Sequence, residues 1–303
     1  MNHRTSPAFR VTLGVAVVGL ALSACGSSSL SGSGGESSST GAAPTQTKNA
    51  ALVAKLPAKV KSAGKIIVGV DATYPPNEFL ASDGKTVRGM DVDLFNALAQ
   101  QFGVTVQWQP AAFDSIITGV QGGKYDIGVS SFTINADRKK QVNMVSYYKA
   151  GTQWVAAKGN PKKVDPNQPC GITVAVQKGT TQYQDDITPK AAKCKAQGKP
   201  MNVLVYSAQD QANAAVVSGK ADAMLADNPV VIDAINHAGG KIEAIGSLYA
   251  TAPYGYVLPK SETAFAQALT EALKSLDTSG DYKKILTNWK LEAGGISDFA
   301  VNP

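Results

Sequence analysis

The sequence contains only two histidines and three cysteines among its 303 residues. It has neither a C-x-x-C pair nor a histidine cluster, the patterns that typically hold transition metals. His3 lies in the N-terminal segment, and His237 ends a predicted helix just before Gly239-Gly240, a position that explains it sufficiently. We therefore expect no metal site and no cofactor.

The chain also lacks any block of like charge and any stripe of basic residues interleaved with aromatic ones. The formal net charge is +6, and without Arg4 and Arg10 there remain 27 basic against 23 acidic residues, a net charge of +4. Nucleic-acid-binding surfaces carry a more clustered positive charge. The composition therefore disfavours nucleic acid as a partner.

Long apolar runs are missing too. The run at 11–22 has 12 residues, fewer than a membrane-spanning helix needs. It follows Arg4 and Arg10, as in an export signal, and ends in LSAC, which resembles the lipobox of bacterial lipoproteins. We predict a signal peptide at 1–24 and a lipidated Cys25 that anchors the chain to the outer face of the cell membrane. An ordinary secretory signal with a stray cysteine is the alternative, and no later segment is apolar enough to span a membrane.

A stretch rich in serine, glycine and threonine follows at 26–47. Because it has almost no large apolar side chains, burial cannot offset the entropy lost on ordering it. About thirty residues of such chain reach roughly 30 Å, enough to hold a folded body clear of the membrane. We assign 25–62 to the lipidated cysteine and a flexible linker, and expect folded structure to begin near Lys55–Gly64.

Strand and helix patterns then alternate twice along the chain. The expected elements are strands at 65–70, 104–108, 127–129, 172–176, 203–205, 221–226 and 249–256, and helices at 91–102, 114–121, 261–276 and 281–289. Gly219–Ala223 also echoes Gly123–Ile127. This order predicts an α/β fold with two lobes, each a mostly parallel sheet flanked by helices. We place lobe boundaries at 63–153 with 250–303 and at 154–249, joined by two hinge strands.

The stretch YDIGVSSFTINADRKK at 125–140 combines a buried strand, a polar turn and a helix start. Ser130, Ser131 and Thr133 bring hydroxyls and free backbone N–H groups to the strand end. Asn135 can cap the helix, and Arg138 falls in its first turn. Backbone donors, a helix N-terminus and a guanidinium fork together suit a carboxylate. The alternative is a surface turn followed by a solvated basic helix.

Other polar residues also follow predicted strands. In parallel sheets, ligands bind beyond the carboxyl ends of the strands. Asp71, Tyr74 and Phe113 leave such ends in the first half, and Asp227 does so in the second. If the lobes face each other, Arg138 confronts Asp227, and the slot between them suits a molecule with both a carboxylate and an ammonium group. We also expect Ser207 and Asn228 to cap the helices that follow them.

Cys170 and Cys194 are the two cysteines left in what reads as an exported chain. An oxidising compartment favours a disulfide between them. On the chain-entropy model, a loop of this length contributes about 3.5 kcal/mol to the stability of the fold.

Six motifs occur in the order found in one known family, over roughly 65–290. They are VGVDATYPPNEF, RGMDVDLFNALAQQFG, FDSIITGVQGGKYDIGVSSFTINADRKK, VAVQKGTT, ADAMLADNP and GDYKKILTNWK. The chain resembles the polar amino-acid-binding proteins of ATP-driven importers, family 3 of the bacterial extracellular solute-binding proteins. The resemblance implies a hinged, two-lobe, monomeric clamp that closes on one free amino acid and then docks on an ABC permease with its ATPase subunits.

The resemblance also implies roles for individual residues. Arg138 would pair with the ligand α-carboxylate, helped by Ser131, Thr133 and Thr181, and Asp227 would hold the α-ammonium group together with the turn at 130–133. Tyr74 and Phe113 would flank the ligand side chain, with Asp71 near its far end. Otherwise Asp71 is a turn residue and the two aromatics belong to the core.

Asp71 is the clue to ligand preference. An unpaired like charge in a closed cleft is costly, so Asp71 disfavours glutamate and aspartate and favours arginine, lysine, histidine or glutamine. Two rival functions remain at this point. One is a ligand sensor that reports to a membrane receptor. The other is a dehydratase-like enzyme acting on cyclic carboxylates, with Asp71 or Glu78 as its general acid or base.

Overall fold

The structure is a computed structural model that describes residues 41–303. The predicted signal peptide and Cys25 lie outside this part of the chain. Across 41–303, no helix combines the length and apolar character needed to cross a bilayer.

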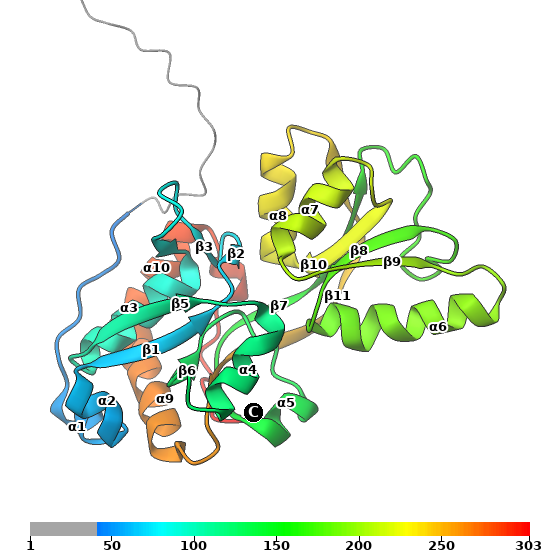
Figure 1. The fold of residues 1–303 in the computed structure, drawn as a ribbon. Coiled ribbons are helices and arrows are strands. Elements are labelled where there is room, and N and C mark those ends of the chain that lie inside the picture. Colours follow the sequence, from blue (N-terminus) through cyan, green and yellow to red (C-terminus); the bar gives the residue numbers. More distant parts are fainter. Residues whose placement is uncertain (1–40) are drawn as a thin grey trace, which may run out of the picture. The chain divides into compact units, whose positions relative to one another are not determined.

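The core of the fold is one eight-stranded sheet (Figure 1). Its strands, in spatial order, are β5 (Thr105–Pro110), β1 (Lys65–Val70), β6 (Ile127–Gly128), β11 (Ile242–Leu258), β7 (Asn143–Ala157), β10 (Ala223–Asp227), β8 (Thr173–Gln177) and β9 (Asn202–Tyr206). We call the half around β5, β1 and β6 lobe 1, and the half around β10, β8 and β9 lobe 2. The short strands within each lobe run parallel, as predicted.

β7 and β11 are the long strands that both lobes share. They pair antiparallel from Asn143 with Leu258 to Ala157 with Ile242, and the register breaks on either side of Tyr249. The sequence predicted only 249–256 as strand. The first part of β11 is mostly exposed and has no clear alternation of apolar residues, so its pattern does not identify it. These two strands are the candidates for the hinge.

Helices cover both faces of the sheet in lobe 1. α3 (Met90–Gln101), α9 (Thr263–Thr278) and α10 (Asp281–Trp289) pack one core, while α4 (Phe113–Gln121) packs a second core with β6 and β11. α5 (Ala136–Gln141) begins at Asn135, whose side chain accepts a hydrogen bond from the Arg138 N–H, as predicted. A small antiparallel sheet of β2 (Thr73–Tyr74), β3 (Glu78–Leu80) and β4 (Val87–Arg88) lies beside α3.

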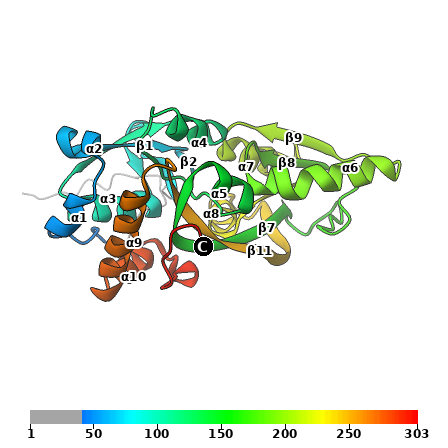
Figure 2. The same ribbon diagram turned by 90° about the horizontal axis from the view of Figure 1, so that it is seen from below.

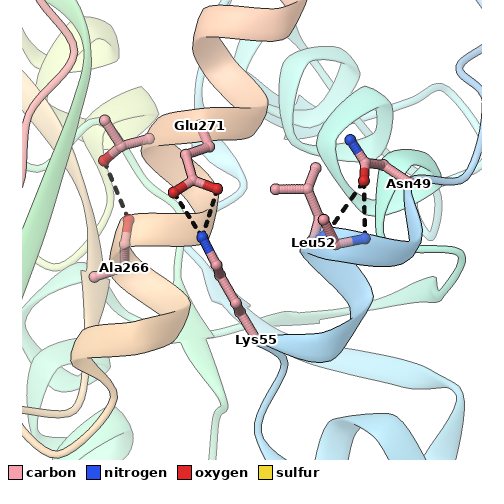
Figure 3. Close-up of polar contacts among 7 residues, drawn as sticks. Asn49, Leu52, Lys55, Ala266 and Glu271 are labelled. Atoms are coloured by element: carbon pink, nitrogen blue, oxygen red, sulfur yellow. Dashed lines mark hydrogen bonds and ion pairs between the residues drawn. The ribbon is translucent and has the colours of Figure 1, made fainter.

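Folded structure begins earlier than predicted, so the linker assignment to residue 62 is wrong at its C-terminal end. α1 (Ala50–Ala54), α2 (Ala58–Ala63) and the turn between them bury Leu52, Val60 and Leu56, respectively, in the core of lobe 1. Asn49 caps α1, and Lys55 forms an ion pair with Glu271 of α9 at 2.6 Å (Figure 3). Figure 2 shows α1 and α3 close to α9.

Lobe 2 contains a π-helix, η1 (Gln182–Ile187), which continues into α6 (Thr188–Ala196). α7 (Gln209–Val217) and α8 (Asn228–His237) pack with β10 in a separate core. The predicted disulfide between Cys170 and Cys194 is confirmed, with the two Cα atoms 5.1 Å apart. It fastens the segment before β8 to α6.

Two predicted helix caps are wrong. The N-cap of α7 is Ala208, not Ser207, and the Gln209 N–H donates to Thr73 Oγ1 of lobe 1 at 3.1 Å. The N-cap of α8 is Asp227, so Asn228 is the first helical residue, and its Oδ1 accepts from the Gly151 N–H. Thr73 thus takes the role expected of Ser207, whereas the Asn228 side chain binds a distant backbone N–H group instead of capping its own helix.

Candidate functional site

The two lobes meet around one small cavity. All nine residues that the sequence predicted as ligand contacts line it, together with Glu78, Gln177, Thr180 and Gln182. They come from β2 and β3, from the ends of β1, β6, β8 and β10, and from the starts of α4, α5 and η1. The strand-end rule therefore locates the cavity correctly, whereas the role of each residue as a ligand contact stays a prediction.

Direct contacts between the lobes close the cavity. They include the hydrogen bonds Tyr74 OH to Asp227 Oδ2 (2.9 Å), Arg138 Nη2 to Gly179 O (3.0 Å) and Gln209 N to Thr73 Oγ1 (3.1 Å), and the ion pair Lys178 Nζ–Asp114 Oδ2 (2.8 Å). The structure is therefore the closed form of the two lobes.

Arg138 supplies a buried positive charge. Its Nη1 donates to the Thr133 carbonyl at 2.8 Å, and its guanidinium carbon lies 5.4 Å and 5.5 Å from the ring centres of Phe113 and Phe132. Burial lowers the pKa of Arg138 to about 10, which leaves it charged at neutral pH. None of the ion pairs of residues 41–303 includes Arg138. Its guanidinium group donates to neutral backbone carbonyls instead.

Asp227 supplies a buried negative charge at the end of β10. Its Oδ1 accepts from Gln182 Nε2 at 2.8 Å, and its Oδ2 accepts from the Tyr74 hydroxyl at 2.9 Å. Burial raises the pKa of Asp227, while these donors and the charge of Arg138 oppose the rise. Like Arg138, Asp227 takes part in no ion pair within the described part of the chain.

Asp71 adds a second acid on the lobe 1 side of the cavity. It accepts hydrogen bonds from Thr73 Oγ1 at 2.9 Å and from Gln177 Nε2 of lobe 2. Burial raises the pKa of Asp71 to about 6, with the two donors lowering it and the negative charge of Asp210 raising it further. At pH 7 most of the Asp71 population is therefore ionised.

Tyr74 and Phe113 line the cavity, as the sequence predicted. Each also contacts one of the buried charged residues. The Tyr74 hydroxyl links the lobes through Asp227. The Phe113 ring stacks on Phe132, with ring centres 4.6 Å apart, and it also faces the guanidinium group of Arg138. Their contact with a ligand side chain remains a prediction.

The turn after β6 differs from the expectation. Ser131 was predicted to offer free donors to a carboxylate, yet its N–H donates to Asp91 Oδ2 at 3.0 Å and its hydroxyl to Glu78 Oε2 at 3.1 Å. The Thr133 carbonyl and the Thr181 hydroxyl contact Arg138 and Gln182, respectively. In this closed form the donors of Ser131 therefore face buried acids.

The sequence analysis did not predict several residues that line the cavity. Gln177 is the last residue of β8, and Gln182 follows Thr181 in the next turn, so the strand-end rule applied to lobe 2 would have found both. Glu78 was considered only as a catalytic acid of the rival enzyme. No sequence pattern shows that it is fully buried beside the cavity.

A fold with two lobes closed over a small cavity that holds opposite buried charges defines a solute-binding protein. The family described as bacterial extracellular solute-binding proteins, family 3, matches residues 66–292. The chain therefore belongs to this family, as its motifs predicted.

Relatives of known name include the arginine-binding protein ArgT of Corynebacterium glutamicum, 36% identical over 252 residues that cover 83% of this chain and 82% of that protein. Among solved structures, an ancestral arginine-binding protein bound to arginine has a TM-score of 0.69 and 30% identity, over 75% of this chain and 98% of that one. A similar structure bound to glutamine has the same TM-score and 31% identity, over 76% and 99% of the chains. These similarities agree with the predicted two-lobe fold.

Proposed function

We propose that this protein captures a free cationic amino acid, L-arginine above all, and delivers it to an ABC permease. The observation that carries the proposal is that Arg138 and Asp227 are both buried on one cavity, and neither forms an ion pair with any residue of 41–303. Buried charges are costly unless they are paired. A zwitterionic amino acid supplies a carboxylate for Arg138 and an ammonium group for Asp227.

Asp71 extends the argument to the ligand side chain. With Arg138, Asp227 and Asp71 ionised, these three side chains carry one excess negative charge. A ligand with a net charge of +1, such as arginine or lysine, neutralises that excess, whereas glutamate doubles it. Glutamine leaves the charge of Asp71 uncompensated but still offers amide hydrogens to it. The names of the relatives, which include arginine-binding proteins, support the same order of preference.

The proposed mechanism is closure about β7 and β11, followed by docking of the closed form on the permease. The register breaks in β11 on either side of Tyr249 support a hinge there. We further propose that the mature chain starts at a lipidated Cys25, which tethers it outside the cytoplasm and near the permease. Co-purification from membranes with a permease would support delivery, whereas co-purification with a signalling receptor would favour the sensor.

The ligand proposal is tested by calorimetric titration of the chain from residue 26 onward with each of the twenty amino acids. Partial unfolding and refolding first removes any ligand that the protein carries from the cell. We expect micromolar or tighter binding of L-arginine, weaker binding of glutamine and none of glutamate. Preferred binding of glutamate or aspartate would overturn the proposed role of Asp71, and no binding by any amino acid would overturn the function.

Closure itself is tested at Gly179, which has φ +79° and lies so close to lobe 1 that an added Cβ would be 2.7 Å from Asp114 Cβ. Gly179→Ala should resist the closed form and weaken L-arginine binding by about 5- to 150-fold. Gly198→Ala is the matched control, because Gly198 has φ +73° and nothing within 4 Å of its added Cβ. If both variants lose the same affinity for L-arginine, backbone strain explains the effect, and the proposal that binding requires closure is contradicted.

The affinity for L-arginine should also depend on pH. Because the pKa of Asp71 is raised to about 6, protons compete with a cationic ligand as the pH falls through 6. We expect calorimetry to give an affinity at pH 5 about tenfold lower than at pH 8. The Asp71→Asn variant should bind more weakly at pH 8 and lose this pH dependence. An affinity that stays constant from pH 8 to pH 5 in the unmodified protein would contradict the role of Asp71.

A further inference from the structure

Two acids lie directly behind the turn that follows β6. Glu78 comes from β3 and Asp91 from the first turn of α3, and both side chains are fully buried. None of the ion pairs formed within 41–303 includes either residue. Burying two carboxylates without a cation is strongly unfavourable, so other interactions must stabilise these acids.

The two acids hold the turn through its serines. Glu78 Oε1 accepts from the Ser130 hydroxyl and Oε2 from the Ser131 hydroxyl, each at 3.1 Å. Asp91 Oδ2 accepts from the Ser131 N–H at 3.0 Å and also from the Tyr147 hydroxyl. Ser131 has φ +49°, a conformation that is uncommon for a residue other than glycine. The acids therefore stabilise a backbone shape that the chain does not favour by itself.

The surroundings of Asp91 Oδ1 indicate that a proton lies between the two acids. This atom is buried, and no N–H, hydroxyl or other conventional donor of the described residues reaches it. The two carboxyl groups nevertheless lie side by side, because the Ser131 hydroxyl is 3.1 Å from Glu78 Oε2 and 3.3 Å from Asp91 Oδ2. A hydrogen bond between two carboxyl groups requires that one of them carries a proton. A protonated Glu78 supplies the donor that Asp91 Oδ1 lacks.

We propose that Glu78 is a neutral acid at pH 7 that donates a hydrogen bond to the Asp91 carboxylate, and that this pair positions the turn at Ser130 and Ser131 for ligand binding. Ser130 Oγ in turn accepts from the Asp71 N–H at 3.0 Å. The pair thus acts on the ligand through the turn and Asp71. Its effect on affinity rests on the proposed function, whereas the protonation of Glu78 does not.

The surroundings of the two acids agree with this assignment. Burial is the main cause that raises the pKa of Glu78 well above its ordinary value, and the negative charges of Asp91 and Asp71 raise it further. Burial raises the pKa of Asp91 only to about 6, because the hydrogen bonds from Tyr147, Glu78 and Ser131 lower it. The other titratable groups that face the pair are tyrosines: Tyr74, Tyr147, Tyr148 and Tyr256.

Carboxyl carbon NMR of the whole mature chain, with ¹³C-labelled glutamate, tests the protonation directly. We expect one glutamate signal to have the chemical shift of a protonated acid at pH 7, and to vanish in Glu78→Gln. The control Glu271→Gln removes an exposed acid and should leave that signal in place. If every glutamate signal is that of an ionised carboxylate at pH 7, the proposal is wrong.

Binding of L-arginine by three variants tests the positioning role. Glu78→Ala should lower the affinity about 5- to 150-fold, because it removes the acceptor that Glu78 offers to the Ser130 and Ser131 hydroxyls and the proton proposed for Asp91 Oδ1. Glu78→Gln should restore most of that loss, since its amide can donate to Asp91 and accept from a serine. Ser131→Ala should resemble Glu78→Ala. A loss in Glu78→Gln as large as in Glu78→Ala would overturn the proposal.

A stability measurement keeps the inference testable even if L-arginine is not the ligand. A raised pKa of Glu78 favours the fold fully at pH values below the ordinary pKa of glutamate, and this contribution disappears as the pH rises through the folded value. Between pH 7 and pH 9.5, the unfolding midpoint of the unmodified protein should therefore fall relative to that of Glu78→Gln. Parallel pH curves for the two proteins would contradict the shared proton.

Discussion

Replacing Arg138 by alanine is expected to weaken L-arginine binding by about 3–5 kcal/mol, or roughly 200- to several thousand-fold. The guanidinium group is buried, and its hydrogen bonds to the Thr133 and Gly179 carbonyls fix it between the lobes. Alanine would leave the ligand carboxylate desolvated and without its counter-charge. Calorimetric titration of the variant measures the loss.

Lys140→Ala is the matched control, because it removes an exposed cation from the same helix and should leave the affinity almost unchanged. Agmatine, which is arginine without the carboxylate, provides a second control from the ligand side. The unmodified protein should prefer arginine to agmatine strongly, and Arg138→Ala should not. If the variant still discriminates between them, the carboxylate is bound elsewhere.

Replacing Asp227 by alanine should have an effect of similar size, again about 3–5 kcal/mol. The carboxylate is buried, and its hydrogen-bond donors within 41–303, which include Tyr74 and Gln182, are neutral. Without it, the ligand ammonium group loses its charged partner, and both donors lose their acceptor. Asp227→Asn keeps the shape of the side chain and isolates the contribution of the charge, which titration with L-arginine measures.

Asp277→Asn serves as the control, since it neutralises an exposed acid of α9. The corresponding ligand is 5-guanidinopentanoic acid, which lacks the α-ammonium group. Omission of this group should weaken binding to the unmodified protein but make little further difference in Asp227→Ala. A full additional loss in the variant would show that Asp227 does not hold the ammonium group.

The sequence was sufficient to predict the parts of the site that follow simple rules of topology. Parallel strands end at the same edge of a sheet, so the order of strands and helices alone places Asp71, the turn at Ser130 and Asp227 around one cleft. Arg138 was placed by its position in the first turn of a capped helix, which the structure confirms. These predictions depend on chain order and not on side-chain contacts.

Contacts between distant segments could not be predicted in this way. Thr73 of lobe 1 accepts the N–H at the start of α7, which a local pattern assigns to Ser207. Gln177 reaches Asp71 across the cleft, and Glu78 pairs with Asp91 in the core, because tertiary packing brings segments of different lobes and layers together. No local sequence pattern distinguishes such a buried acid from an exposed one.

A crystal structure of the mature chain with bound L-arginine tests the central claim most directly. We predict that the α-carboxylate contacts the Arg138 guanidinium group, that the α-ammonium group lies within hydrogen-bonding distance of Asp227, and that the side-chain guanidinium group points toward Asp71. Arginine bound in the opposite orientation, or outside the cavity between the lobes, would contradict the account.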